Sequence, residues 1–142
     1  MRRYLAVCVD NVSEYDTVMK QVVLGVVDDD VSVRKSLARL LRSEGFAVQT
    51  YSSSEEFLSA TDVSAVDCLI LDMHLGGMSG LDLWKHLQRA GSATPVIFIT
   101  AHDQLPSGQD LPAERPPPCL RKPFDGDLLM DTIRHALGSA WR

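Results

Sequence analysis

The sequence predicts a doubly wound α/β domain, in which helices cover both faces of a five-stranded parallel sheet of order 2-1-3-4-5. Short apolar runs rich in Val, Ile and Leu alternate along the chain with amphipathic helical patterns, and these helices supply the crossovers that parallel strands need. The length of 142 residues, with 45% hydrophobic and 23% charged residues, suits one domain with a buried core.

The first half of the chain carries two strand–helix units. Residues 22–27 form a continuous β-branched apolar run, which is typical of a strand buried on both faces. Apolar residues at helical spacing follow, until Gly45 ends the pattern. Residues 46–51 predict the second strand, and Ser53 with Glu56 forms a capping box that opens a short helix.

The second half contains three further strands and two clear helices. Apolar runs at residues 66–71, 95–99 and 119–121 predict the strands. Ser79 caps a helix after the third strand, and Asp125 caps the last helix after the fifth.

The connection between the fourth and fifth strands departs from this regular pattern. Residues 102–118 hold five of the seven prolines, and a proline inside a helix costs about 3 kcal/mol. We therefore expect an irregular segment there, with at most a turn or two of helix.

Composition excludes several classes of protein. The net charge of −5 disfavours direct contact with nucleic acid or anionic lipid, and the chain lacks the ~18 consecutive apolar residues of a membrane span. Three widely spaced cysteines fit neither a disulfide framework nor a zinc site, which predicts a reducing, cytoplasmic setting. We divide the chain into an N-terminal extension of unknown role, residues 1–20, and one domain, residues 21–142.

Polar residues gather where the predicted strands end. Asp28 and Asp29 follow the first strand, Asp72 the third, Thr100 the fourth and Lys122 the fifth. The carboxyl ends of parallel strands share one edge of the sheet, so these side chains are expected to meet there. Three crowded carboxylates need a cation, and an all-oxygen site suits Mg²⁺. Taken singly, each residue could instead be a turn residue, a helix cap or a solvated charge.

With these residues in place, the chain from Val22 to Leu137 resembles a response-regulator receiver domain of bacterial two-component signalling, whose fold is flavodoxin-like. The matching segments are Val26–Asp30 with Val33-Arg34, Leu69–His74 with Met78-Ser79-Gly80, Val96–Ala101, and Lys122-Pro123-Phe124. The resemblance is strongest to receivers that precede helix-turn-helix output domains.

The resemblance implies that Asp72 accepts a phosphoryl group from a phosphohistidine on a sensor histidine kinase or a phosphotransfer protein. It also implies a bound Mg²⁺, with no other cofactor. The ion would be held by the carboxylates of Asp29 and Asp72 and the backbone carbonyl of His74, with Asp28 acting through water.

Further roles follow from the same resemblance. Lys122 would supply a cation to the phosphoryl oxygens, and Thr100 would donate its hydroxyl to the acyl phosphate. The peptide bond between Lys122 and Pro123 is expected to be cis. The imidazoles of His74 and His102 would flank the path of attacking water and tune dephosphorylation, unless both point to solvent.

The chain departs from the family pattern on its expected output face. Gly76 replaces a usual proline, and Cys119 stands where relatives place an aromatic switch residue. With the proline-rich residues 102–118, these changes predict that phosphorylation does not drive the usual dimerisation, and a monomer is favoured.

Two alternatives to a self-contained phosphoacceptor domain stay open. The chain, which ends at Arg142, could be the receiver fragment of a longer DNA-binding transcriptional regulator, or a phosphorylation-independent interaction module. We do not expect an enzyme acting on a separate substrate. A phosphatase of the haloacid-dehalogenase class is disfavoured, because His74 stands where its second aspartate would be.

Overall fold

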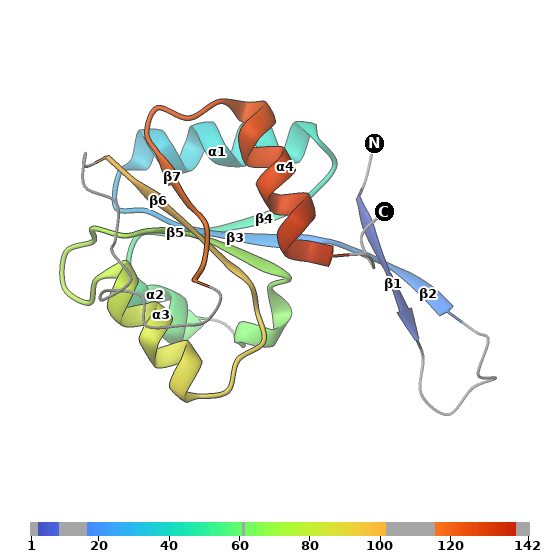
Figure 1. Cartoon of the computed structure of the whole chain (residues 1–142), viewed down its shortest axis with the longest axis horizontal. Coiled ribbons are helices and arrows are strands. Elements are labelled where there is room, and N and C mark those ends of the chain that lie inside the picture. Colours follow the sequence, from blue (N-terminus) through green and yellow to red (C-terminus); the bar gives the residue numbers. More distant parts are fainter. Residues whose placement is uncertain (1–2, 9–16, 61, 102–115, 139–142) are drawn as a thin grey trace.

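A computed structural model of the chain describes residues 3–8, 17–60, 62–101 and 116–138. The central sheet has five parallel strands in the order β4-β3-β5-β6-β7 (Figure 1). Their bounds are β3 Val23–Val27, β4 Ala47–Tyr51, β5 Cys68–Asp72, β6 Val96–Thr100 and β7 Cys119–Arg121. Numbered along the domain, this is the predicted 2-1-3-4-5 order of a flavodoxin-like fold, which is thereby confirmed.

Four α-helices cover the two faces of this sheet in the part of the chain that the structure describes. Helices α1 (Val31–Ser43) and α4 (Gly126–Leu137) lie on one face, while α2 (Ser54–Ala60) and α3 (Gly80–Arg89) lie on the other (Figure 1). Each face buries its own apolar cluster, one including Leu41 and Ile133 and the other Phe57. The sheet is therefore buried on both sides, as its continuous apolar strands require.

The central strands β5 and β6 explain why the sheet is a rigid base for polar residues at its edge. All ten of their residues are buried. Alternate side chains enter opposite clusters: Ile70 packs with α1 and α4, while Leu71 packs with α2 and α3. Full burial of one such side chain contributes about 1.5–3 kcal/mol, so the ends of these strands are firmly placed.

Helix boundaries follow the predicted capping residues. The side chain of Ser79 accepts a hydrogen bond from the backbone of Asp82 at the start of α3, and that of Asp125 accepts one at the start of α4. Gly45 ends the α1 segment with a φ of 96°, a backbone conformation that side chains other than glycine rarely adopt.

The predicted capping box of α2 forms with one difference. The Glu56 N–H donates to Ser53 Oγ at 3.0 Å, as expected. The Glu56 carboxylate, however, accepts a hydrogen bond from the backbone N–H of Ser52, one residue before the cap, at 2.8 Å. Ser52 also donates its hydroxyl hydrogen to that carboxylate, and this second hydrogen bond favours Ser52 over Ser53 as the partner of the Glu56 side chain.

The N-terminal segment contains structure that the sequence analysis did not predict. Strands β1 (Tyr4–Cys8) and β2 (Thr17–Gln21) form an antiparallel hairpin that projects from the domain (Figure 1). Its base is joined to the domain by two backbone hydrogen bonds, from Arg3 N–H to the Gly45 carbonyl at 2.7 Å and from Val22 N–H to the Arg3 carbonyl at 2.8 Å. A short 3₁₀ helix, η1 (Val63–Ala65), also precedes β5.

The predicted irregularity between the fourth and fifth strands falls mostly on residues 102–115, which lie outside the described residues. Residues 116–118 lead into β7 without regular secondary structure, and the Pro118 carbonyl accepts the Phe98 N–H at 2.8 Å. Within the described ranges, no helix has the length and apolar character needed to cross a membrane.

Candidate functional site

The carboxyl edge of the sheet brings together charged residues from three strands. Asp28 and Asp29 directly follow β3, Asp72 is the last residue of β5, and Lys122 directly follows β7. Parallel pairing places these strand ends side by side, although Lys122 is far from the aspartates in sequence.

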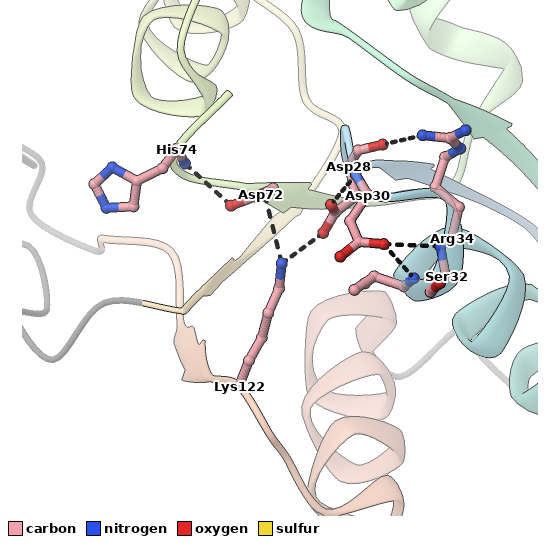
Figure 2. Close-up of polar contacts among 8 residues, drawn as sticks. Asp28, Asp30, Ser32, Arg34, Asp72, His74 and Lys122 are labelled. Carbon is pink, nitrogen blue, oxygen red and sulfur yellow. Dashed lines mark hydrogen bonds and ion pairs between the residues drawn. The ribbon is translucent and has the colours of Figure 1, made fainter. Parts of the chain in front are cut away.

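Asp28 is fully buried and held on three sides (Figure 2). Its Oδ1 accepts the Asp30 N–H at 2.9 Å, and its Oδ2 lies 2.7 Å from Lys122 Nζ. The Asp28 backbone carbonyl accepts a hydrogen bond from Arg34 Nη1 at 2.7 Å. A buried carboxylate is stable only with such partners, so the start of α1 and the end of β7 both fix Asp28.

Asp30 begins helix α1 and connects that helix to the site. Its Oδ1 accepts the backbone N–H groups of Ser32 at 2.8 Å and Val33 at 3.4 Å, which identifies Asp30 as the N-cap. The Asp30 N–H also donates to Asp28. The loop between β3 and α1 is therefore fixed by the same hydrogen bonds that orient Asp28.

Asp72 is 5% exposed and makes two polar contacts that orient its carboxylate. Its Oδ1 accepts the His74 N–H at 3.1 Å, and its Oδ2 lies 3.5 Å from Lys122 Nζ (Figure 2). Burial raises the pKa of the Asp72 carboxyl above its ordinary value; the His74 N–H and Lys122 oppose this rise, and the charge of Asp28 adds to it.

Lys122 bridges the two buried carboxylates. Its backbone N–H donates to the Thr100 carbonyl at 2.7 Å, and the peptide bond to Pro123 is cis, as predicted. Burial alone would lower the pKa of Lys122, but its hydrogen bond to Asp28 and the charges of Asp72 and Asp28 raise that pKa overall. Lys122 is therefore a fixed cation at neutral pH.

The three aspartates form one cluster of oxygen ligands. Carboxylate oxygens of Asp28, Asp29 and Asp72 all lie within 4.8 Å of one another. Asp29 is exposed, so the cluster opens to solvent on that side. Lys122 contacts two of the three carboxylates, those of Asp28 and Asp72. Its single positive charge leaves an excess of negative charge in the cluster, whose hard oxygen donors are of the kind that hold Mg²⁺.

A close backbone approach fixes the loop that follows Asp72. A Cβ on Gly80 would lie 2.0 Å from the Asp72 carbonyl oxygen, so only glycine fits there. The Gly80 N–H donates to the Met73 carbonyl at 3.1 Å. On the far side of the loop, Glu55 accepts the Met78 N–H at 2.6 Å. These contacts hold the segment between β5 and α3 at the site.

The other predicted site residues have different outcomes. Thr100 is fully buried at the end of β6, and it follows Ile99, the register partner of Asp72. The His74 side chain is exposed and points away from Asp28 and Lys122 (Figure 2). His102 lies outside the described residues. The roles expected of Thr100, His74 and His102 in phosphorylation and dephosphorylation stay predictions.

Asp30, Arg34 and Gly80 fall in the segments that match the receiver family, but no supporting role at the site was predicted for them, and Glu55 was not singled out. The role of Asp30 could have been predicted from the sequence, because an aspartate directly before a helical pattern is a common N-cap. The contacts of Arg34 and Glu55 join separate elements, so no local pattern reports them.

The comparisons with known proteins agree with this arrangement. Residues 24–134 match the family model described as "Response regulator receiver domain". The chain is 37% identical over 115 residues to response regulator protein TodT of Pseudomonas putida, covering 81% of this chain and 51% of TodT. It is also 37% identical over 113 residues to the transcriptional regulatory protein FixJ of Azorhizobium caulinodans, covering 80% of this chain and 54% of FixJ. The chain thus spans about half the length of these curated relatives.

Solved structures show the same likeness. The response regulator StyR matches with a TM-score of 0.74 at 38% identity, covering 83% of this chain and 60% of that one. A receiver protein from Burkholderia phymatum matches with a TM-score of 0.69 at 44% identity, covering 82% of this chain and 95% of that one. The strand order, the acidic cluster with Lys122 and the family match lead to one conclusion: this chain belongs to the response regulator receiver domain family.

Proposed function

We propose that the domain is a phosphoacceptor in a two-component phosphorelay, and that Asp72 takes a phosphoryl group from a phosphohistidine on a sensor histidine kinase or phosphotransfer protein. The observation that carries this proposal is the pair of contacts around Asp72. Its carboxylate lies at the carboxyl edge of the sheet. One of its oxygens contacts Lys122 Nζ, and the other accepts the His74 N–H.

The donor set of the site fits a magnesium ion. The carboxylates of Asp28, Asp29 and Asp72 offer only oxygen atoms. Among the described residues, Lys122 is the cation that pairs with the carboxylates of Asp28 and Asp72, and its one positive charge leaves negative charge in excess. We propose that Asp29, Asp72 and the His74 carbonyl hold the ion directly and that Asp28 acts through water. When bound, Mg²⁺ neutralises charge on the transferring phosphoryl oxygens.

The residues of the chain supply positioning and charge. An oxygen of the Asp72 carboxylate attacks phosphorus, the bond from phosphorus to the histidine nitrogen breaks, and its electron pair returns to the imidazole. The His74 N–H fixes the carboxylate orientation, because it comes from the rigid loop that Gly80 and Glu55 hold. Lys122 places a positive charge beside the attacked group, and Thr100 is proposed to donate its hydroxyl to the acyl phosphate.

A second candidate concerns what this domain controls. The matched relatives are about twice as long as the matched region, and FixJ is named a transcriptional regulatory protein. We propose as the alternative that this chain is the receiver part of a longer transcriptional regulator. Reading the genomic frame beyond Arg142 tests it: a helix-turn-helix coding sequence in frame would support it, and a stop codon would contradict it.

A small-molecule phosphodonor tests the phosphoacceptor proposal directly. After treatment with phosphoramidate and Mg²⁺, intact-mass spectrometry should show one added phosphoryl group, and chelation of Mg²⁺ should abolish it. Asp72→Asn should not gain the group, whereas Asp82→Asn, at an exposed position on α3, should gain it like the parent. Phosphorylation of Asp72→Asn at the parent level would contradict Asp72 as the acceptor. No phosphorylation of the parent protein would favour a phosphorylation-independent module.

A further inference from the structure

A basic groove lies on the outer flank of α1, beside Thr50 near the carboxyl end of β4. Its volume is about 580 Å³, and its lining includes four cationic side chains and no carboxylate: Arg34, Lys35, Arg39 and Arg42. Helix α1 contains no aspartate or glutamate at all. The chain as a whole carries a net charge of −5, so this positive groove is a local feature.

The cations of this groove fall into two pairs. Arg34 Nη1 and Arg42 Nη2 donate to the backbone carbonyls of Asp28 and Val48, at 2.7 and 3.1 Å. Lys35 and Arg39 are exposed, and the described hydrogen bonds and ion pairs include neither of them. They lie four residues apart on one helix face, where like charges repel. An anionic partner in the groove would therefore stabilise the helix.

The groove adjoins an open edge of the sheet. Among the described residues, β4 pairs only with β3. The Ala47 N–H donates to the Val22 carbonyl, and the Tyr51 carbonyl accepts the Asp28 N–H, so residues 47 and 51 direct their backbone groups towards β3. Because these directions alternate along a strand, Val48 and Thr50 direct theirs outwards.

Most of the outward backbone groups of β4 are available for a partner. The Val48 carbonyl accepts Arg42 Nη2, which leaves the Val48 N–H and both backbone groups of Thr50 for another strand. Thr50 is exposed and lines the basic groove. A strand paired at this edge would therefore lie directly beside the cations of α1.

We propose that this edge docks an extended acidic segment of a partner protein by strand addition. The segment pairs its backbone with Val48 and Thr50, and every second side chain faces Lys35 and Arg39. Val48 packs on the α1 side and Tyr51 on the α2 side, so an added strand also has one face towards each helix.

The charges on the two sides define the sequence that this edge selects. The α1 side is basic, whereas the α2 side carries Glu56, whose carboxylate accepts the Ser52 N–H directly after β4. Acidic side chains are attracted on the first side and repelled on the second. The preferred segment therefore alternates acidic and uncharged residues. This docking is independent of the proposed phosphorylation of Asp72.

Two synthetic peptides of about eight residues test the proposal by NMR titration at about 50 mM salt. One alternates Glu and Thr, and the other has the same composition with all Glu residues in one block. The alternating peptide should bind at least about ten-fold more tightly, and high salt should weaken its binding. The amides of Val48 and Thr50 should gain protection from hydrogen exchange in its presence.

Matched variants separate the groove from general charge effects. Lys35→Glu with Arg39→Glu should weaken binding of the alternating peptide at least about ten-fold, whereas Lys85→Glu with Arg89→Glu on α3 makes the same charge change and should weaken it far less. Thr50→Pro removes one outward donor without breaking a bond to β3, and it should also weaken binding.

Several results would overturn the proposal. They are equal binding of the two peptides, no protection of Val48 and Thr50, equal losses in the α1 and α3 variants, or no binding to the parent protein at millimolar peptide.

Discussion

The carboxyl edge of the sheet and the basic groove on α1 both concentrate charge, but in opposite ways. At the carboxyl edge, Asp28 and Asp72 are buried, and Lys122 contacts both. In the groove, Lys35 and Arg39 are exposed, and no carboxylate of the described residues lines the groove with them. Buried charges require close partners and leave room only for a small ion, whereas exposed charges of one sign attract extended partners and are screened by salt. Single substitutions at the carboxyl edge should therefore change stability strongly, whereas substitutions of the exposed groove cations should change it little.

The largest effect is expected where the backbone itself is crowded. Gly80→Ala places a Cβ 2.0 Å from the Asp72 carbonyl oxygen and should lower the free energy of unfolding by about 3 kcal/mol. Urea unfolding measures the change. Gly76→Ala is the matched control in the same loop, because no heavy atom lies within 4 Å of its added Cβ. Equal losses in the two variants would mean that the close approach at Gly80 does not hold the loop.

A smaller loss of stability is expected from the bridging lysine. Lys122→Met leaves buried Asp28 without its cation and should lower the free energy of unfolding by about 2 kcal/mol, less than for a fully buried pair because the Lys122 side chain is 17% exposed. Added Mg²⁺ should restore part of this loss by binding the native carboxylates. Lys85→Met on α3 serves as control. If Lys122→Met left the free energy of unfolding unchanged, the bridging role of Lys122 would be contradicted.

The charge of Asp72 should itself oppose folding when Mg²⁺ is absent. Because the pKa of folded Asp72 is raised, its protonated carboxyl group contributes stability that is present at low pH and lost as pH rises through the folded pKa. Asp72→Asn should therefore be more stable than the parent at neutral pH without Mg²⁺, and this gain should vanish below the ordinary aspartate pKa of about 3.9. Urea unfolding across this pH range measures it, and a gain that does not depend on pH would contradict the assignment.

The smallest effect tests the separation of the two regions. Lys35→Glu with Arg39→Glu should change the rate of phosphorylation by phosphoramidate less than about two-fold, because both side chains are exposed and salt screens interactions between exposed charges. Mass spectrometry over time gives the rate at 0.1 M salt. A ten-fold change would show that the groove and the phosphorylation site are coupled.

The fold was largely predictable because its signals are local. Continuous apolar runs marked the buried strands, and Ser79 and Asp125 marked helix starts that the structure confirms. The hairpin of β1 and β2 was missed because no Gly or Pro turn signal separates its two strands. Residues 1–20 were therefore predicted only as an N-terminal extension, with no secondary structure assigned to them.

The site was predictable in composition but not in its supporting contacts. Strand order alone brings Asp28, Asp72 and Lys122 to one edge, so their meeting followed from topology. The reach of Glu55 to the Met78 N–H depends on how α2 packs beside the loop after β5, which no spacing in the sequence encodes. The clash that reserves position 80 for glycine is likewise visible only in three dimensions.

The chemical identity of the phosphorylated residue tests the central claim most directly. Borohydride reduces an aspartyl phosphate to homoserine, and peptide sequencing by mass spectrometry then locates it. After phosphorylation of the parent protein with Mg²⁺, homoserine should appear at position 72. Homoserine at position 28 or 29, or phosphate retained on a histidine with none at 72, would contradict the assignment of Asp72 as the phosphoacceptor.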